Sequence, residues 1–434
     1  MLVIKKSVFV FFCALVPFVI NDNQISNMIS SLRFSTKNPY FFKDLNTFNY
    51  TDFTAKKVWA IYRHGTRYPG KKVISKYMGL IDHIDSLQNA SFLTNEEKSA
   101  FKEWKPMPID LKHQKFLTKE GEEELYNLGT RFRSQFMNNF NEDQTNITIK
   151  HTPTQRANVS ARKFVEGLFQ STANNHEIIE VDRDDPVLRP YKGCPLWRKT
   201  VKKNPASLNE KKLLMESATV ENLVNEMREL TQIKDLDFAD IELIYNMCGF
   251  ETAWRHLPHN GKSIWCSFFK NEQHLNIMEY LEDMEYYWID GPGFEITRKV
   301  ACKTVDDMLN HLDPTNEKQS LSFYFTHSGT MLKLLTFLEL YKDDFQLTAD
   351  KLNYQRQWRT SHIDSFASNI IAVLYESNQY GPHVQLLHQE SVVEIPKCKA
   401  NEFGMCSYDD FRGFYENKIK ECNLSAICND KDEL

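Results

Sequence analysis

The stretch Ala60-Ile61-Tyr62-Arg63-His64-Gly65-Thr66-Arg67-Tyr68-Pro69-Gly70 decides the fold of this chain. Residues 57–62 are mostly apolar, aromatic or β-branched, and they predict a buried strand. Apolar residues recur at helical spacing from Val73 to Ile81, so residues 63–69 form a strand-to-helix turn. Ligands of open α/β sheets bind at such turns, outside the carboxyl ends of the strands. The stretch therefore predicts a ligand site within an α/β fold.

The turn places two guanidinium groups and one imidazole within five residues. Arg63 and Arg67 can hold phosphate oxygens through planar, bidentate hydrogen bonds. A neutral imidazole at His64 can attack phosphorus, because the unperturbed pKa of histidine lies near neutrality. Gly65 has no side chain, and we expect it to let the backbone approach a ligand closely. The alternative is a turn of solvated charges, and so many phosphate-binding groups directly after a strand argue against it.

Two further strand-turn-helix units follow the same plan. Residues 146–151 alternate like a strand, and a helix with one apolar face opens after residues 152–154. Arg156 lies in the first turn of that helix, where free N–H groups already favour an anion. Residues 321–326 predict a third strand, which ends at His327. Taken alone, Arg156 could be an exposed helix-end arginine and His327 a structural histidine. Together the three units bring one set of side chains to the same sheet edge: Arg63, His64, Arg67, Arg156 and His327.

These residues resemble the signature of the histidine acid phosphatase family, which includes the phytases. Residues 117–121, running into 128–133, are similar to a second family landmark, and residues 155–168 to a third. Four later segments most resemble the multiple inositol polyphosphate phosphatase branch: Trp265-Cys266-Ser267, Glu279 to Asp283, Tyr287-Trp288 and Gly291 to Phe294. The resemblance spans residues 55 to 410, which is nearly the whole chain after its first segment.

The resemblance implies both a fold and a mechanism. The fold would be α/β, with a mixed, mostly parallel sheet, flanking helices and a helical cap insertion. His64 would be the nucleophile and form a phosphohistidine, while Arg63, Arg67, Arg156 and His327 hold the phosphoryl oxygens. No metal or other cofactor is expected, because the arginines supply the positive charge. The expected partner is an anionic small-molecule substrate, an inositol polyphosphate.

The chain departs from the family pattern directly after His327. The inositol phosphatases carry His-Ala-Glu here and the phytases His-Asp, whereas this chain has His327-Ser328-Gly329. Neither Ser328 nor Gly329 can donate a proton as a carboxylic acid does, and general acid catalysis is worth roughly 10²–10⁴-fold. Asp364, in a segment that resembles another family landmark, is the candidate substitute acid. Two functions stay open: an active inositol polyphosphate phosphatase, which the intact His64 favours, and a binding protein without turnover, which Gly329 favours.

Both ends of the sequence carry targeting signals. Residues 1–20 hold Lys5 and Lys6 followed by an apolar run, and they predict a signal peptide; an uncleaved anchor is the alternative. The last four residues, Lys431 to Leu434, match the address that a receptor reads for retrieval to the endoplasmic reticulum. No later run reaches the roughly 18 apolar residues that indicate a membrane span. We therefore expect the lumen of the endoplasmic reticulum, which argues against a cytosolic mutase with an Arg-His nucleophile.

The cysteines and glycosylation sequons fit that compartment. Eight cysteines follow the predicted signal peptide: Cys194, Cys248, Cys266, Cys302, Cys398, Cys406, Cys422 and Cys428. An even count in an oxidising compartment predicts up to four disulfides, but the sequence alone cannot choose the pairs. The resemblance to phytase spacing favours Cys248 with Cys266 and Cys398 with Cys406. Five Asn-x-Ser/Thr sequons predict a glycoprotein: Asn49, Asn89, Asn146, Asn158 and Asn423.

Length and composition limit the number of domains and the kinds of partner that the chain can have. It has 434 residues, 41% of them hydrophobic, which suits one or two domains with a large core. The net charge of −5 argues against nucleic acid as a general partner. We divide the chain into a signal peptide (1–20), an α/β core (21–185 and 301–434) and a mainly helical cap (186–300).

Three local expectations complete the picture. Residues 21–54 are polar with scattered aromatics, and we expect them to cover the surface. Residues 370–375 and 384–388 are predicted to form a hairpin of edge strands. The basic run 198–203 is either a solvated face or a rim that attracts polyphosphates.

Overall fold

The computed structural model describes residues 32–42, 50, 52–81, 90–104, 110–254, 263–316 and 318–429. By their contacts, residues Arg33–Leu434 form one compact unit. The predicted targeting signals at both ends and the sequons at Asn49 and Asn89 lie outside the described residues.

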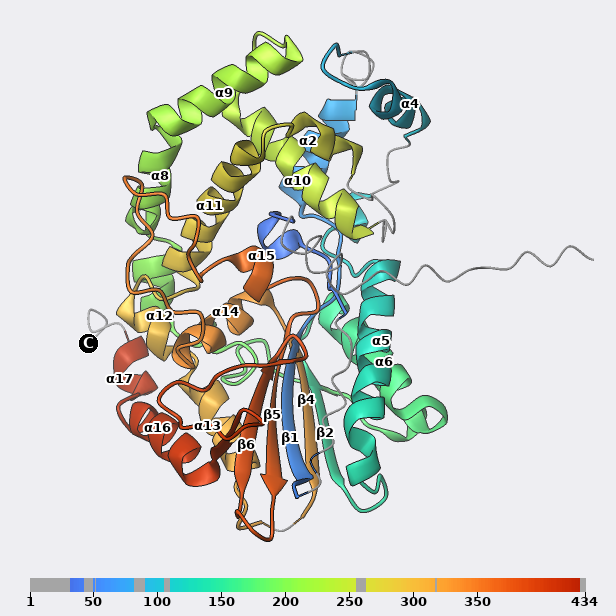
Figure 1. The fold of residues 1–434 in the computed structure, drawn as a ribbon, viewed down its shortest axis with the longest axis vertical. Helices are drawn as coiled ribbons and strands as arrows, with labels where there is room; N and C mark the ends of the chain where they lie inside the picture. The colour runs from blue at the N-terminus through green and yellow to red at the C-terminus, as the bar shows by residue number, and fades with distance from the viewer. Residues whose placement is uncertain are drawn as a thin grey trace, which may run out of the picture. The chain divides into compact units, whose positions relative to one another are not determined.

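One mixed sheet of eight strands forms the centre of this unit (Figure 1). The strand order is β3-β2-β4-β1-β5-β6-β7, and β8 pairs with β6. The pairings among β1, β2, β3 and β4 are parallel. The pairings of β1 with β5, β5 with β6, β6 with β7 and β6 with β8 are antiparallel. The strands are β1 (Thr54–Arg63), β2 (Asn146–His151), β3 (Ile179–Glu180), β4 (Ser320–Thr326), β5 (Asn369–Glu376), β6 (His383–His388), β7 (Ser391–Val392) and β8 (Met405–Ser407). The predicted α/β class with a mixed sheet is confirmed.

The register of the parallel strands brings the three predicted turns together. In the ladder between β1 and β4, Arg63 lies opposite Thr326. In the ladder between β2 and β4, His151 lies opposite Phe325. The three strands therefore end at nearly the same level, and the residues that follow them share one edge of the sheet.

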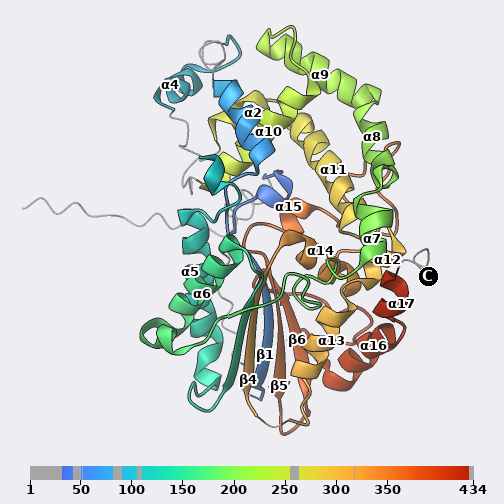
Figure 2. The ribbon, with the colours of Figure 1, turned by 180° about the vertical axis from the view of Figure 1, so that it is seen from behind.

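Helices cover both faces of the sheet (Figure 2). On one face, α5 (Lys119–Phe136) and α6 (Gln155–Phe169) pack against each other, and α6 contacts β2 and β4. The ring of Phe164 in α6 lies 5.1 Å from that of Phe323 and 5.5 Å from that of Phe325. On the other face, the Trp59 indole donates a 2.8 Å hydrogen bond to Asp307 of α13 (Cys302–His311). The elements α14 (Ser328–Phe337) and α16 (Tyr408–Lys420) also contact strands.

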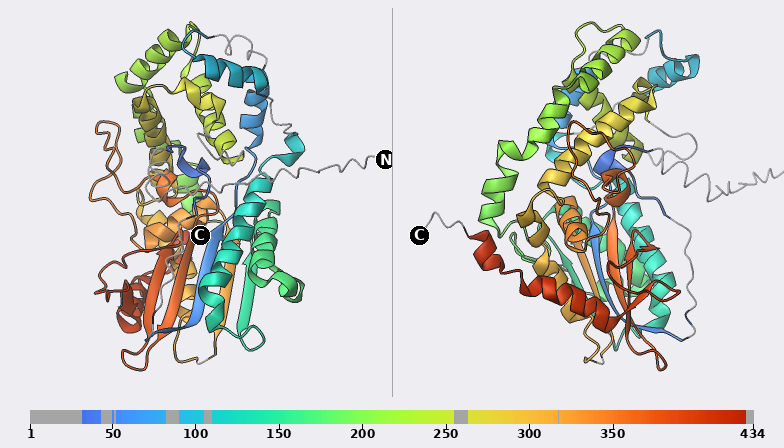
Figure 3. Two further views of the ribbon diagram at one scale, coloured as in Figure 1. Left: turned by 45° about the vertical axis from the view of Figure 1, so that its right-hand side comes forward. Right: turned by 60° about the vertical axis from the view of Figure 1, so that its left-hand side comes forward.

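Between β3 and α13, residues 195–299 form helices and connecting loops, which lie beyond the ends of β1, β2 and β4 (Figure 3). They are α7 (Pro195–Trp197), η5 (Arg198–Lys202), η6 (Pro205–Leu208), α8 (Asn209–Met215), α9 (Ala218–Thr231), α10 (Phe238–Trp254), η7 (Ile264–Phe268), α11 (Glu272–Ile289) and α12 (Glu295–Lys299). The helix α2 (Lys71–Ile81) contacts α10, and α4 (Asn95–Glu103) contacts η7. The division into core and cap stays a prediction. None of the described helices is long and apolar enough to cross a membrane.

The remaining short helices lie mostly in the connections. They are η1 (Ser35–Lys37), η2 (Leu111–His113), η3 (Met137–Asn139), η4 (Gln170–Asn175), α15 (Thr360–Ile363) and α17 (Leu424–Cys428).

The expectation that the segment before β1 covers the surface is wrong for residues 34–40, which are buried. Phe34 and Tyr40 supply apolar surface to the interior. The polar Asn38 side chain is satisfied there, because it accepts from the Phe34 amide at 3.1 Å and donates to the Ser361 carbonyl at 2.8 Å. Buried polar groups are tolerated when they are hydrogen-bonded in this way.

The predicted hairpin forms from β5 and β6, but β5 is not an edge strand. It lies between β1 and β6, and all of its residues except Glu376 are buried. The physical reason is visible in the sequence: an unbroken apolar run such as Ile370 to Leu374 has no solvent face, as is typical of an interior strand.

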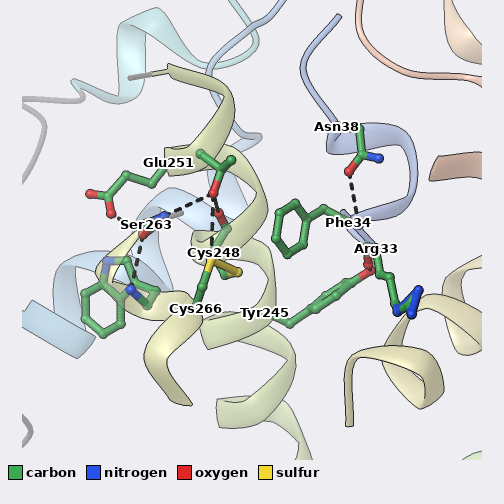
Figure 4. The surroundings of a disulfide bond; sticks show 10 residues. Arg33, Phe34, Asn38, Tyr245, Cys248, Glu251, Ser263 and Cys266 are labelled. Atoms are coloured by element: carbon green, nitrogen blue, oxygen red, sulfur yellow. Dashed lines mark hydrogen bonds between the residues drawn. A yellow bond between two sulfur atoms is a disulfide. The ribbon is translucent and has the colours of Figure 1, made fainter. Parts of the chain in front are cut away.

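The four disulfides include both pairs that the resemblance favoured, Cys248–Cys266 and Cys398–Cys406. The other two are Cys194–Cys428 and Cys302–Cys422. Figure 4 shows the Cys248–Cys266 bond, which fastens α10 to η7. Beside it, the buried carboxylate of Glu251 accepts hydrogen bonds from Ser263 and, at 2.5 Å, from the Trp104 indole. These bonds fix α10, whose last turn contacts the turn after β1.

Candidate active site

The turn after β1 is held by a carboxylate that sequence reasoning missed. Glu124 of α5 is buried and accepts hydrogen bonds from the Thr66 amide at 2.7 Å and the Thr66 hydroxyl at 2.8 Å. In the sequence, Glu124 is marked only as a charged residue next to the apolar face of a predicted helix. Gly65 also serves this packing: a Cβ there would lie 2.4 Å from the Gly121 carbonyl oxygen. Gly65 therefore permits a close approach to α5, and its expected approach to a ligand stays a prediction.

The contacts of His64 fix the tautomer of its imidazole. Its Nδ1 lies 2.9 Å from the Gly65 carbonyl oxygen, which can only accept, so Nδ1 carries the proton and Nε2 carries the lone pair. Its backbone N–H donates to Thr326 at 3.1 Å, which ties the turn to β4. Burial, followed by the charges of Arg156 and Arg63, holds the pKa of His64 well below its usual range. The lowered pKa favours the unprotonated imidazole.

His327 lies beside His64, with 5.6 Å between the ring centroids. Arg156 can only donate, so its Nη2, 3.3 Å away, makes His327 Nδ1 an acceptor. The other ring nitrogen, Nε2, then donates to the Thr152 hydroxyl at 3.0 Å. Burial, followed by Arg156 and Arg189, lowers the pKa of His327 well below its ordinary value. Both ring nitrogens of this neutral histidine are engaged.

Three buried arginine nitrogens around the histidines have no protein partner among the described residues: Nε of Arg63, Arg156 and Arg189. All three guanidinium groups lower the pKa of His327, so they surround one place. Arg63 is anchored through Nη1, which donates to the carbonyls of Thr36 at 2.8 Å and Asp364 at 2.5 Å. A buried donor without an acceptor is costly, and an anion with several oxygens would satisfy all three.

Arg189 is a site residue that sequence reasoning missed. It follows no predicted strand and lies in none of the segments that resemble family landmarks. Arg67, which was predicted, stacks over the Phe250 ring at 5.6 Å, and its carbonyl accepts from the Trp254 indole at 3.2 Å. Burial, then Arg156 and Arg63, lowers the pKa of Arg67 to about 9. The pKa of Arg156 is lowered to about 10, chiefly by burial. This crowding of cations is what a bound phosphate relieves.

In the structure, Asp364 lies next to the turn that follows β4, at His327 and Ser328. The Ser328 hydroxyl donates a hydrogen bond to Asp364 Oδ2, and Arg63 Nη1 lies 3.7 Å from the same oxygen. Asp364 is fully buried, and its Oδ1 has no partner among the described residues. Burial raises the pKa of Asp364 to about 7; Arg63 and Ser328 oppose that rise, and Asp290 adds to it. The carboxyl therefore holds its proton well above the ordinary range of an aspartic acid.

A second carboxylate lies next to Gly329. A Cβ on Gly329 would lie 3.2 Å from Asp290 Oδ1, at the end of α11. That oxygen accepts from the ammonium of Lys333, a fully buried residue of α14. Sequence reasoning missed this pair, because nothing in the sequence connects residue 290 with residue 329.

Basic residues continue outward from Arg189. Partial burial lowers the pKa of Lys192, and the neighbouring cations lower it further: Arg189, Arg198, Arg183 and Lys202. Arg198 and Lys202 belong to the basic run 198–203 and are exposed. Over the described ranges, no group of three or more His, Cys, Asp or Glu side chains could hold a metal ion.

This fold and this cluster of arginines and histidines define a class of protein. Residues 54–389 match the Histidine phosphatase superfamily (branch 2), and the chain belongs to that family. It is thus an enzyme of the histidine phosphatase type. The chain is 32% identical over 378 residues to "Multiple inositol polyphosphate phosphatase 1" of Drosophila melanogaster, and the match covers 82% of this chain and 78% of the relative.

Two solved structures share the fold. A phytase from D. castellii has a TM-score of 0.76 at 17% identity, with 92% of this chain and 87% of that chain covered. A multiple inositol polyphosphate phosphatase from Bifidobacterium longum, in complex with inositol hexasulfate, has a TM-score of 0.70 at 15% identity. That match covers 88% of this chain and 97% of the other. The expected family is confirmed.

Proposed function

We propose that the chain is a phosphomonoesterase that hydrolyses inositol polyphosphates through a phosphohistidine at His64. One observation carries the proposal: the buried Nε groups of Arg63, Arg156 and Arg189 have no partner among the described residues, and all three guanidinium groups lie close enough to His327 to lower its pKa. Such donors match the oxygens of a phosphoryl group, and a neutral Nε2 on His64 supplies the attacking lone pair. Positioning and charge stabilisation of this kind supply most of the catalysis that phosphoryl transfer requires.

The substrate class rests on the relative from Drosophila melanogaster and on the charge around the site. That relative is named for inositol polyphosphates. A substrate with several phosphates needs cations beyond those that bind the reacting group. The basic residues that extend from Arg189 through Lys192 to Lys202 would serve as the rim anticipated for the run 198–203.

The test is phosphate release by the purified mature protein. We expect release of phosphate from inositol hexakisphosphate by the parent protein and none by His64→Ala. Phosphate release by His64→Ala at the parent rate would remove His64 from the nucleophilic role.

A binding protein without turnover is the second candidate, and the observation that favours it is Gly329. It stands where the resembling branch has its proton-donating Glu, and it is a helical residue of α14. Tight binding of inositol hexakisphosphate without any phosphate release would establish this candidate. The intact His64 favours the enzyme, because a protein that only binds needs no nucleophile.

We also propose that the protein resides in the lumen of the endoplasmic reticulum as a glycoprotein. The supporting features are residues 1–20, the terminal Lys431 to Leu434, and eight cysteines joined in four disulfides. Removing the last four residues should divert the protein to the medium, because a retrieval receptor reads that address. Full retention of the truncated protein would point to an uncleaved anchor.

A further inference from the structure

Release of an inositol alkoxide needs a proton, and the two turn positions that could supply a carboxylic acid hold Ser328 and Gly329. The question of which group donates that proton rests on the proposed function. The donor must hold a proton at working pH and must have a path to the leaving oxygen, directly or through one hydroxyl.

His327 does not meet these conditions. Its Nδ1 accepts from Arg156 at 3.3 Å, and its Nε2 donates to Thr152 at 3.0 Å. Burial, followed by the surrounding cations, lowers the pKa of the ring well below its usual range, and neither ring nitrogen is left to donate a proton to a leaving oxygen.

Asp290 lies close to Gly329 but is already committed to a cation. One of its oxygens accepts from the buried ammonium of Lys333, which lies 4.3 Å from the centre of the Trp197 ring and 4.8 Å from that of Tyr191. That oxygen is therefore occupied by the Lys333 ammonium and is not free to face a leaving group. Asp290 is therefore the competing candidate that an experiment must separate.

Asp364 meets both conditions through Ser328. Ser328 begins α14 directly after His327 and is half-buried, whereas Asp364 is fully buried. The hydrogen bond between Ser328 Oγ and Asp364 Oδ2 joins the two groups. A hydroxyl both accepts and donates, so it can pass a proton from a buried acid to an oxygen in the site.

The groups that face Asp364 come from three elements. Arg63, at the end of β1, lies 3.7 Å from Oδ2, and Ser328 comes from α14. Asp290, at the end of α11, acts on Asp364 by charge repulsion. Burial and Asp290 favour the protonated carboxyl before the reaction, and Arg63 stabilises the carboxylate that forms.

We infer that Asp364 and Ser328 form the proton-donating pair of this enzyme, with Ser328 in contact with the leaving oxygen. In the first step His64 Nε2 attacks phosphorus, and the bond from phosphorus to the leaving oxygen breaks with its electron pair on that oxygen. For this transfer the Ser328 hydroxyl turns from Asp364 Oδ2 to the leaving oxygen and accepts a hydrogen bond from the protonated Asp364 carboxyl. The hydroxyl proton then moves to the leaving oxygen, and the Asp364 proton replaces it on Oγ.

The second step runs the same path in reverse. Water attacks the phosphohistidine, and the bond from phosphorus to Nε2 breaks with its electron pair on nitrogen. One proton of the water passes to Ser328, and the serine proton returns to Asp364. The enzyme is thereby restored and inorganic phosphate is released. Ser328 is the group that touches the reacting atoms, while Asp364 acts through it.

The test compares two leaving groups in the variants Asp364→Asn and Ser328→Ala. An inositol alkoxide is basic and needs the proton, whereas nitrophenolate is stable as an anion. We expect each variant to form phosphoenzyme from inositol hexakisphosphate about 10²-fold more slowly. Formation from nitrophenyl phosphate should stay within a few-fold of the parent rate, and the phosphoenzyme should then accumulate, because its hydrolysis also uses the pair.

Asp290→Asn is the matched control, since it removes a second carboxylate charge beside the same turn. On the acid side of the Asp364 pKa of about 7, where Asp364 is protonated with or without the charge of Asp290, it should change the two rates of phosphoenzyme formation by the same factor. Equal slowing of both substrates in Asp364→Asn and Ser328→Ala would overturn the inference and leave the nucleophile intact. A leaving-group split in Asp290→Asn alone would assign the donor to Asp290. A parent protein that forms no phosphoenzyme from either substrate would instead overturn the proposed function. Ser328→Ala, which removes only a hydroxyl, decides the matter if Asp364→Asn does not fold.

Discussion

The Ser328 hydroxyl donates a hydrogen bond to the Asp364 carboxylate, which joins two residues 36 positions apart in the chain. By the family resemblance, Ser328 occupies the position where phytases carry an aspartic acid, and the structure places a carboxyl in hydrogen-bond contact with its hydroxyl. The acid that the turn after β4 lacks is thus available from the segment before β5. This relationship favours an enzyme over a protein that only binds.

The first prediction concerns pH. A general acid works only when protonated, and burial raises the pKa of Asp364 to about 7. We expect kcat/KM for inositol hexakisphosphate to fall as pH rises through about 7, and this alkaline limb to be absent in Asp364→Asn. The measurement is a pair of pH–rate profiles, because kcat/KM reports groups of the free enzyme. An unchanged limb in Asp364→Asn would assign the titration to another group.

The second prediction is a rescue. Gly329 is helical and stands where the resembling branch has Glu, so a carboxyl placed there should donate directly. Asp290 lies 3.2 Å from the new Cβ, and its negative charge would favour the protonated form of the added Glu. We expect Gly329→Glu to restore inositol hexakisphosphate turnover in the Asp364→Asn background by about ten-fold or more. Gly329→Gln is the control, and equal rescue by it would mean that the gain comes from binding.

The third prediction concerns the phosphate clamp. Arg156 should make charge-assisted bonds to the substrate worth roughly 1.5–3 kcal/mol. Arg156→Ala should therefore weaken binding of inositol hexakisphosphate by about ten-fold or more. The matched control is Arg162→Ala, because Arg162 is an exposed arginine on the same helix. Calorimetric titration of both variants decides the matter: equal affinities would place the ligand elsewhere.

The fourth prediction concerns stability. Gly65→Ala would set a Cβ 2.4 Å from the Gly121 carbonyl oxygen, and overpacking of this kind costs about 1–3 kcal/mol. Gly413→Ala, in α16, meets no atom within 4 Å and should raise stability by about 0.5–1 kcal/mol. Urea denaturation of the two variants measures both effects. A fully stable Gly65→Ala would show that the turn can move away from α5.

Much of the fold was predictable from the sequence because its signals are local. The strand before Arg63, the strand before Thr152 and the strand before His327 each carry their own pattern, and parallel pairing then brings their ends together. The unbroken apolar run of β5 also indicates an interior strand, so the prediction of an edge strand gives this run too little weight. By contrast, the burial of residues 34–40 depends on partners such as Ser361, hundreds of residues away in sequence.

The residues of the site also fall into those that the sequence predicts and those that only the folded structure brings together. His64, Arg63 and Arg67 share one turn, and Arg156 and His327 follow strands, so their meeting could be predicted. Arg189, Glu124 and Asp290 reach the site through tertiary packing alone. Asp364 was a candidate by resemblance, but only the structure shows its contact with Ser328. Side-chain hydrogen bonds between distant segments leave no periodic pattern in a sequence.

The most direct test of the central claim is to trap the phosphoenzyme. Brief incubation of the purified protein with labelled substrate, followed by a quench that avoids acid, should yield one acid-labile phosphoryl group per chain. His64→Ala should yield none. Equal labelling of His64→Ala, or no labelling of the parent protein by either inositol hexakisphosphate or nitrophenyl phosphate, would contradict the claim that His64 is the nucleophile of a phosphatase.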